Sequence, residues 1–206
     1  MDYYKCKKCR RASRKLFLKG ERCFTQKCAM IKKPYGPGVH GKKRRAGLSE
    51  YGRQLLEKQA IRRTYGVSEK QFKNYILAAM QKKGDKRELL LKSLEKRLDN
   101  VIFRLGWAKS RASARQVVGH AHILVNSRRM NIPSYEVKVG DSIEIKKKSR
   151  FLAPFKNLEE NLKKQVIPAR LSLSPDKAGA KVVSDVIIGD EKEIQNLGMV
   201  IEFYSR

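Results

Sequence analysis

The chain has 206 residues and a formal net charge of +28, because 48 Lys and Arg side chains stand against only 20 Asp and Glu side chains. A hydrophobic fraction of 41% suffices for one or two folded domains and excludes a disordered chain. The first residues carry no signal-peptide core and no apolar run could cross a membrane, so we expect a cytoplasmic protein whose partner is a polyanion, in the first place a nucleic acid.

The excess positive charge lies in the first three quarters of the chain. Residues 1–48 hold 16 basic and 2 acidic side chains, residues 49–150 hold 24 and 10, and residues 151–206 hold 8 of each. The charge continues through segments with helical periodicity, which indicates a folded, extended electrostatic surface and not only a basic arm. The neutral last quarter is typical of a scaffold or of a segment that faces another protein.

The N-terminal segment carries all four cysteines, in two closely spaced pairs. Both pairs can chelate the same metal ion, because the loop between them can close a tetrahedral site. Four thiolates leave no open coordination position, so the pattern predicts a structural Zn²⁺ site. An iron–sulfur cluster uses the same ligands and stays an alternative; unligated core cysteines are disfavoured because the segment has too few apolar residues for a core. We expect neighbouring cations to lower the thiol pKa values. The predicted ligands are Cys6, Cys9, Cys23 and Cys28.

A Pro- and Gly-rich stretch at 34–41 follows and predicts an extended linker. Its glycine spacing, Gly36-x-Gly38-x-x-Gly41, matches a dinucleotide-binding pattern, but no strand precedes it and no helix follows it. We therefore interpret it as linker. The run of cations after it is a candidate for RNA contact and consists of Lys42, Lys43, Arg44 and Arg45.

Three helices are predicted next. The first spans about 50–64, is capped by Ser49 and ends at Gly66. The second begins with a capping box at Ser68 and ends at Gly84, and the third runs through the apolar residues from Leu90 to Leu105. Carboxylates beside cations, as in Glu57-Lys58 and Glu95-Lys96, are interpreted as solvated ion pairs. The first helix carries four cations predicted to contact RNA, namely Arg53, Lys58, Arg62 and Arg63.

After Gly106 the periodicity changes. Ser110 caps a short helix, and strand spacing follows at Ile123 and Val125 and again over 137–145, with turns between the strands. Helix N-termini attract phosphate, and the aromatic residues sit at core positions, so we expect recognition of folded RNA by shape and backbone. A solvated charged face is the alternative for any single cation. The predicted contacts are Lys109, Arg111, Arg115, Asn126, Arg128 and Arg129.

The last quarter predicts a helix over about 155–165 and extended pieces around 182–188 and 199–204. We expect an α+β fold: a mainly helical domain, an inserted small module of two helices and an antiparallel sheet, and a metal-stapled N-terminal segment. The three histidines assemble no catalytic set, so no enzyme is expected. The predicted divisions are 1–43 for the metal-binding segment and linker, 44–96 for the first part of the helical domain, 97–150 for the module and 151–206 for the return to the helical domain with C-terminal strands.

Several motifs resemble one family. Arg97-Leu98-Asp99-Asn100-Val101 and Ser110-Arg111-x-x-Ala114-Arg115-Gln116 resemble the small αL-type RNA-binding module named for bacterial small-subunit ribosomal protein S-four. Lys19-Gly20-Glu21-Arg22-Cys23 and Glu202-Phe203-Tyr204-Ser205-Arg206 are similar to the full-length protein of that family, in its cysteine-bearing, metal-binding form.

The resemblance implies a primary binder of 16S rRNA that nucleates assembly of the body of the small (30S) subunit. It also implies contact with small-subunit protein S-five, a position at the mRNA entrance channel and a contribution to translational accuracy. Two alternatives stay open: a zinc-containing DNA-binding regulator, and an RNA-modifying factor with an accessory RNA-binding module. The 56 residues after the module are too few for a catalytic domain, which disfavours the second alternative.

Overall fold

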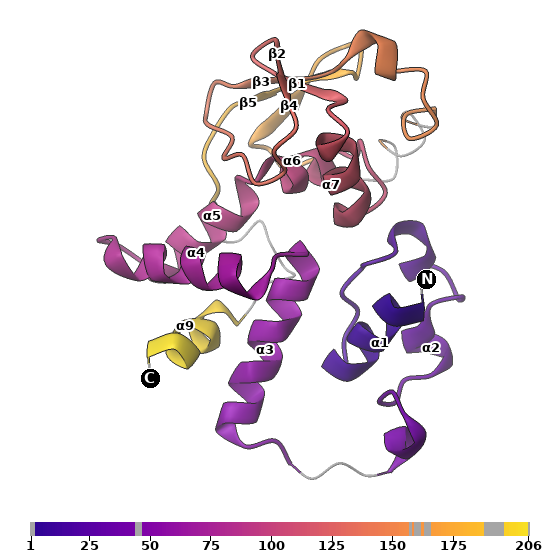
Figure 1. Ribbon diagram of the computed structural model, residues 1–206, viewed down its shortest axis with the longest axis vertical. Helices are drawn as coiled ribbons and strands as arrows, with labels where there is room; N and C mark the ends of the chain where they lie inside the picture. The colour runs from indigo at the N-terminus through magenta and orange to yellow at the C-terminus, as the bar shows by residue number, and fades with distance from the viewer. Residues whose placement is uncertain are drawn as a thin grey trace. The chain divides into compact units, whose positions relative to one another are not determined.

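The computed structural model forms two compact units, one of residues 1–87 with 191–206 and one of residues 88–190. Helices make up the first unit, and the second contains helices and a small sheet (Figure 1). None of the helices in the described ranges is long and apolar enough to span a membrane. The residues that the structure describes are 3–43, 47–156, 158, 162, 166–187 and 196–205.

The first unit contains five α-helices among its described residues. They are α1 (Tyr3–Ala12), α2 (Ala29–Lys32), α3 (Glu50–Tyr65), α4 (Glu69–Gln81) and α9 (Leu197–Ser205), with 3-10 turns η1 (Gly20–Cys23) and η2 (Val39–Lys42). The prediction of α3 and of the start of α4 is confirmed, and both helices begin with a local cap; α4 ends at Gln81 and not at Gly84. Ser49 Oγ accepts a hydrogen bond from the Gly52 N–H at 3.1 Å, and Ser68 Oγ accepts one from the Gln71 N–H at 3.3 Å. Gly66 ends α3 with φ +65°, a conformation that favours glycine.

Helix α9 occupies residues for which the sequence predicted an extended piece, so the prediction of a strand over 199–204 is wrong. Leu197 and Val200, three positions apart, are buried. The Phe203 ring lies 5.4 Å from the Tyr51 ring of α3, against which α9 packs. A helix places residues three and four apart on one face, which is the arrangement that this packing needs.

The third predicted helix, 90–105, is in fact two helices, α5 (Lys86–Glu95) and α6 (Leu98–Arg104). The break falls at Arg97, whose backbone is extended (φ −63°, ψ 135°). Backbone groups around Arg97 form hydrogen bonds with residues 135–137, including an isolated β-bridge. The hydrogen bonds that would have continued the helix are thus replaced by long-range ones, which no local pattern indicates.

The second unit also contains α7 (Arg111–Gly119) and an antiparallel sheet in the order β2-β1-β3-β5-β4. The strands are β1 (Ile123–Val125), β2 (Arg128–Met130), β3 (Ser142–Ile145), β4 (Leu171–Leu173) and β5 (Gly179–Val182), and a 3-10 turn η3 covers Lys147–Ser149. Ile123 of β1 lies opposite Met130 of β2 and Ile145 of β3. The inner face of the sheet and helices α6 and α7 share one core, which includes the fully buried Trp107.

The observed fold confirms the prediction of mixed helices with a small antiparallel sheet. β4 was not predicted, and β5 overlaps the expected extended piece at 182–188 only at its last residue. Both strands add to a sheet that the sequence places within 97–150. The predicted helix over 155–165 lies partly outside the described residues; of its described members, Phe155, Leu158 and Leu162 pack on the core.

Candidate nucleic-acid interface

The β1–β2 hairpin carries three of the predicted RNA-binding residues. Asn126 begins the turn with φ +47°, followed by a second left-handed residue, as in the tight two-residue turns of hairpins. Its side chain serves the fold, because Nδ2 donates to Asp141 Oδ1 at 2.8 Å. Arg128 and Arg129 are exposed on β2, an edge strand of the sheet, so both can reach an external phosphate.

Helix α7 begins at the predicted cap, where Ser110 Oγ accepts a hydrogen bond from the Ser113 N–H at 3.3 Å. The next residue, Arg111, is buried. Its Nε donates to Asn100 Oδ1 at 2.8 Å, and its guanidinium lies 4.6 Å from the centre of the Phe103 ring. Arg111 therefore has a role inside the unit, and its contact with RNA stays a prediction.

Arg115 and Lys109 offer positive charge at the start of α7. The Arg115 side chain is 48% exposed and lies 3.8 Å from Asp99, a buried carboxylate that already pairs with Arg97 at 2.6 Å. A guanidinium has five N–H donors, so Arg115 can bind a further acceptor while it keeps this contact. Lys109 is exposed one residue before the cap. Together with the helix dipole, these charges favour an anion at this end of α7.

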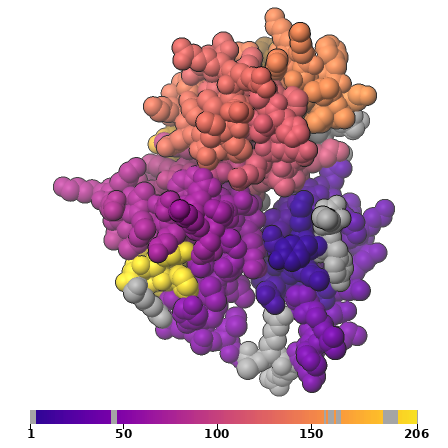
Figure 2. All heavy atoms as spheres, viewed as in Figure 1, coloured from indigo at the N-terminus to yellow at the C-terminus, as the bar shows by residue number. Residues whose placement is uncertain are grey.

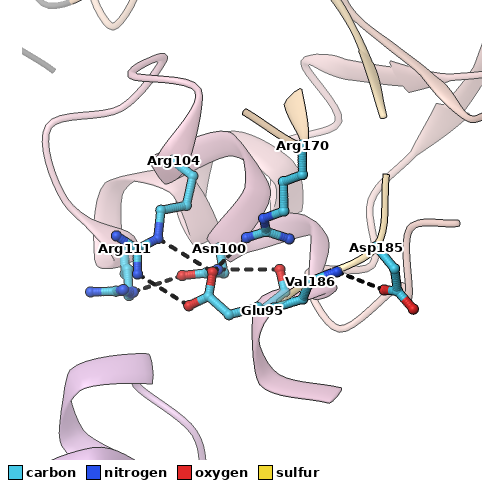
Figure 3. A network of polar contacts seen from close by, with 7 residues as sticks. All are labelled: Glu95, Asn100, Arg104, Arg111, Arg170, Asp185 and Val186. Carbon is cyan, nitrogen blue, oxygen red and sulfur yellow. Dashed lines mark hydrogen bonds and ion pairs between the residues drawn. The ribbon is translucent and has the colours of Figure 1, made fainter. Parts of the chain in front are cut away.

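Arg111 belongs to a buried polar network around the Glu95 carboxylate (Figure 3). The carboxylate of Glu95, which has no exposed surface, accepts hydrogen bonds from Arg104 at 3.2 Å, Arg170 at 2.6 Å and Asn100 at 2.8 Å. Asn100 in turn holds Arg111. The network joins α5, α6 and α7 to the residue before β4, and the guanidinium groups of Arg104 and Arg170 compensate the buried negative charge of Glu95.

The interpretation of Glu95 as a member of a solvated pair is therefore wrong. Its partners come from other elements, one of them 75 residues away. Glu57 and Lys58 do not pair with each other either, because Glu57 lies 2.8 Å from Arg14 of the loop after α1. Sequence reasoning missed Glu95 and Asn100 as positioning residues, since their burial depends on tertiary contacts.

Lys58 is buried on α3, where its Nζ lies 2.6 Å from Glu69 and 4.6 Å from the centre of the Phe203 ring. Arg62 lies 3.1 Å from the same carboxylate, which also accepts a hydrogen bond from the Tyr204 hydroxyl at 3.0 Å. Burial and this hydrogen bond raise the pKa of Tyr204 to about 12. Lys58 and Arg62 thus hold α3, α4 and α9 together, and their contact with RNA stays a prediction.

The remaining predicted cations of the first unit differ in their surroundings. Arg63 is half-buried at the end of α3, and its pKa is lowered by burial and then by the charges of Arg62 and Arg11. An anion beside Arg63 would relieve this repulsion. Arg44 and Arg45 fall outside the described residues. The exposed members of the set are Lys42, Lys43 and Arg53.

The four cysteines line one small cavity of about 20 Å³ together with Leu18 and Met30. This volume has room for a single water-sized occupant. The Lys19 N–H donates to the sulfur of one of them at 3.4 Å. Three of the four thiols are buried, and the cavity unites the members of both pairs: Cys6, Cys9, Cys23 and Cys28.

The expected lowering of the thiol pKa values does not hold for Cys9 and Cys23. Burial raises the pKa of both thiols and outweighs the hydrogen bonds from the backbone of Leu16 and Lys19. As the side chains stand, no three His, Cys, Asp or Glu residues in the described part of the chain form a group that could hold a metal ion. The four sulfur donors and their shared cavity fit a metal site. The side chains themselves, however, do not stand close enough together to coordinate an ion.

A fold of helices with a small sheet, carrying exposed arginines, is typical of a basic protein that binds a polyanion. Residues 2–95 match the family of the ribosomal protein S4/S9 N-terminal domain, and residues 96–143 match the S4 domain. The chain is 47% identical over 203 residues to the small ribosomal subunit protein uS4 of Thermotoga petrophila, which covers 98% of this chain and 96% of the relative.

Two further relatives carry the same name. The uS4 protein of Natranaerobius thermophilus is 47% identical over 204 residues, with 98% of this chain and 96% of the relative covered. That of Thermosipho africanus is 52% identical over 164 residues, with 79% and 78% covered. The chain therefore belongs to the bacterial uS4 family of small ribosomal subunit proteins, which are structural proteins and not enzymes. The resemblance to this family is confirmed, whereas its cysteine-bearing, metal-binding form stays a prediction.

Proposed function

We propose that the protein is a structural constituent of the small ribosomal subunit in the cytoplasm, where it binds 16S rRNA. The observation that carries this proposal is its similarity to uS4 proteins along 98% of the chain. The charge of +28 supports it, because a surface of this kind needs a polyanion to offset its self-repulsion. Arg53 of the first unit and Arg115, Arg128 and Arg129 of the second are exposed cations suited to phosphate contacts.

We infer further that the protein binds early and nucleates assembly of the subunit body at a junction of several rRNA helices. Protein S-five and mRNA at the entrance channel are its other proposed neighbours, and through them it contributes to translational accuracy. The neutral composition of residues 151–206 supports a protein-facing role for this part. Large apolar side chains are exposed there at Phe151 and Val166, as expected of a surface that another protein covers.

Competition binding tests the choice of RNA. Labelled 16S rRNA should be displaced from the full chain by unlabelled 16S rRNA and only weakly by duplex DNA of equal phosphate content. The double variant Arg128→Gln, Arg129→Gln should weaken rRNA binding and lower the salt dependence by about two phosphate contacts. The matched control Lys70→Gln, Lys73→Gln removes the same charge from the exposed face of α4. Equal displacement by duplex DNA would instead support a DNA-binding regulator.

We also propose that the four cysteines bind a structural Zn²⁺ ion, with an iron–sulfur cluster as the alternative. Two pairs of sulfur donors that line one cavity support this, since four thiolates are a common donor set for structural zinc. Bound zinc would supply a cross-link between α1 and the segment around η1 and α2. The side chains must close around the ion, and each thiol must lose its proton on binding.

Elemental analysis of the purified chain tests the metal. We expect about one zinc ion per chain, lost in the variant Cys9→Ser, Cys28→Ser, and an N-terminal segment that becomes sensitive to proteolysis after chelation. Iron with visible absorbance would identify the cluster instead. A chain with neither metal, whose N-terminal segment resists proteolysis in chelator, would contradict a structural metal site.

A further inference from the structure

A basic hollow of about 290 Å³ lies beside α1 in the first unit. Its size is near the lower end of the range for ligand pockets, about 300 to 1,000 Å³. Figure 2 shows the atoms of α1, in indigo, at the surface of the molecule. Among the described residues that line the hollow there are four cations, Lys7, Lys8, Arg11 and Arg63, and no acid. The other lining residues are Tyr4, Pro37 and Gly38.

Two faces of α1 line two different cavities. Cys6 and Cys9, three positions apart, line the thiol cavity. Tyr4, Lys8 and Arg11 follow one another at four and three positions and therefore share another face of the same helix, the one at the hollow. Basic residues next to the cysteines in sequence therefore also form one wall of the hollow.

The walls of the hollow are tied together by contacts outside it. Arg14 just beyond α1 lies 2.8 Å from Glu57 of α3. Arg10 of α1 donates hydrogen bonds to the backbone oxygens of Tyr35 and Gly36, both at 2.9 Å, and so holds the linker that contributes Pro37 and Gly38. The hollow is therefore a formed feature of the unit and not a gap between loose segments.

The charges in the hollow have an aromatic ring among them. The Lys8 Nζ lies 5.2 Å from the centre of the Tyr4 ring, and Tyr4 itself is 66% exposed. The half-buried Arg63 has a lowered pKa because of burial and the nearby charges of Arg62 and Arg11. The charges of Arg11 and Arg63 favour an anion, and the exposed ring offers a surface on which a base can stack.

We propose that this hollow binds one unpaired nucleotide of RNA, with its phosphate at Arg11 and Arg63 and its base against the Tyr4 ring. The hollow is larger than a phosphate group needs, and it combines cations with an aromatic ring, which is the chemistry of single-stranded RNA sites. This departs from the expectation that folded RNA is recognised by its shape and backbone, because it adds a stacked base. It rests on the proposed function in that 16S rRNA supplies the nucleotide.

The base contact is tested with Tyr4→Ala and Tyr4→Phe in the full chain. We expect Tyr4→Ala to weaken binding to 16S rRNA about 5-fold or more, the range for loss of one stacked base, and Tyr4→Phe to bind almost like the unchanged chain. Chemical probing should show one unpaired base that the unchanged chain protects and Tyr4→Ala does not. If Tyr4→Ala keeps both affinity and protection, the nucleotide assignment is overturned.

The phosphate contact is tested with Arg11→Gln, Arg63→Gln against the control Lys70→Gln, Lys73→Gln. The first variant should reduce the slope of log affinity against log salt by about 1 to 2, and the control should change it less. Unchanged thermal unfolding excludes loss of the fold as the cause. Equal slopes for both variants would overturn the hollow as a site while leaving rRNA binding by the protein intact. Failure of the unchanged chain to bind 16S rRNA would instead overturn the proposed function.

Discussion

Single residues of this protein show how far burial can differ from what sequence neighbours suggest. Glu95 precedes Lys96 in sequence, yet its carboxylate is fully buried and bound by Arg104 and Arg170. The local pattern is that of an exposed ion pair, and contacts with Asn100, Arg104 and Arg170 reverse it. Sequence reasoning identified the charged residues correctly but could not tell which ones the fold encloses.

Replacement of Glu95 by Gln is expected to destabilise the second unit by about 3–5 kcal/mol, because it leaves two guanidinium groups without their shared negative charge. The measurement is urea unfolding followed by circular dichroism. Glu88→Gln is the control, since Glu88 lies 2.7 Å from Lys92 in a partly exposed pair and such pairs contribute about 0–1 kcal/mol. Equal effects of the two substitutions would contradict the importance of the buried network.

Tyr204 provides a test in alkaline solution. Its pKa is raised from an ordinary value of 10.0 to about 12 by burial and by the hydrogen bond to Glu69. A raised pKa stabilises the folded state below pH 10, and this contribution is lost as pH rises toward 12. Absorbance titration of tyrosine should therefore show a component near 12 that is missing in Tyr204→Phe. Glu69→Gln should move it toward 10; a Tyr204 that titrates near 10 in the unchanged chain would contradict the contact.

Whether a helix or strand could be predicted depends on whether the interactions that define it are local in the sequence. The starts of α3, α4 and α7 were predictable because Ser49, Ser68 and Ser110 accept hydrogen bonds from backbone N–H groups only three residues away. The break at Arg97, helix α9 and strand β4 were not, because each exists through contacts with distant segments. The hairpin turn at Asn126 was again local and is confirmed.

The linker offers a further prediction. An added Cβ at Gly41 would lie 2.0 Å from the Gly36 oxygen, whereas one at Gly47 would meet nothing within 4 Å. Gly41→Ala should therefore destabilise the first unit by about 1–3 kcal/mol through overpacking, and Gly47→Ala should stay within about 0.5 kcal/mol. Thermal unfolding of both variants checks this. A Gly41→Ala chain as stable as Gly47→Ala would show that the linker is not folded in this way.

For the whole molecule, charge is the property that connects fold and function. All of the +28 arises in residues 1–150, while residues 151–206 are neutral. The structure divides this charge into three kinds: cations engaged inside the units, such as Lys58 and Arg111; exposed cations, such as Arg128; and those that gather at the hollow beside α1. The net charge and the class of partner follow from the sequence. Which cations are enclosed and which are exposed depends on tertiary contacts.

The salt dependence of binding to 16S rRNA tests this account most directly. A chain that neutralises six or more phosphates should lose about 10³-fold or more in affinity between 50 and 200 mM salt. We expect a linear fall of log affinity with log salt for the full chain, with the control Lys70→Gln, Lys73→Gln close to the same line. An affinity for 16S rRNA that hardly changes over this range would contradict binding through the exposed cations.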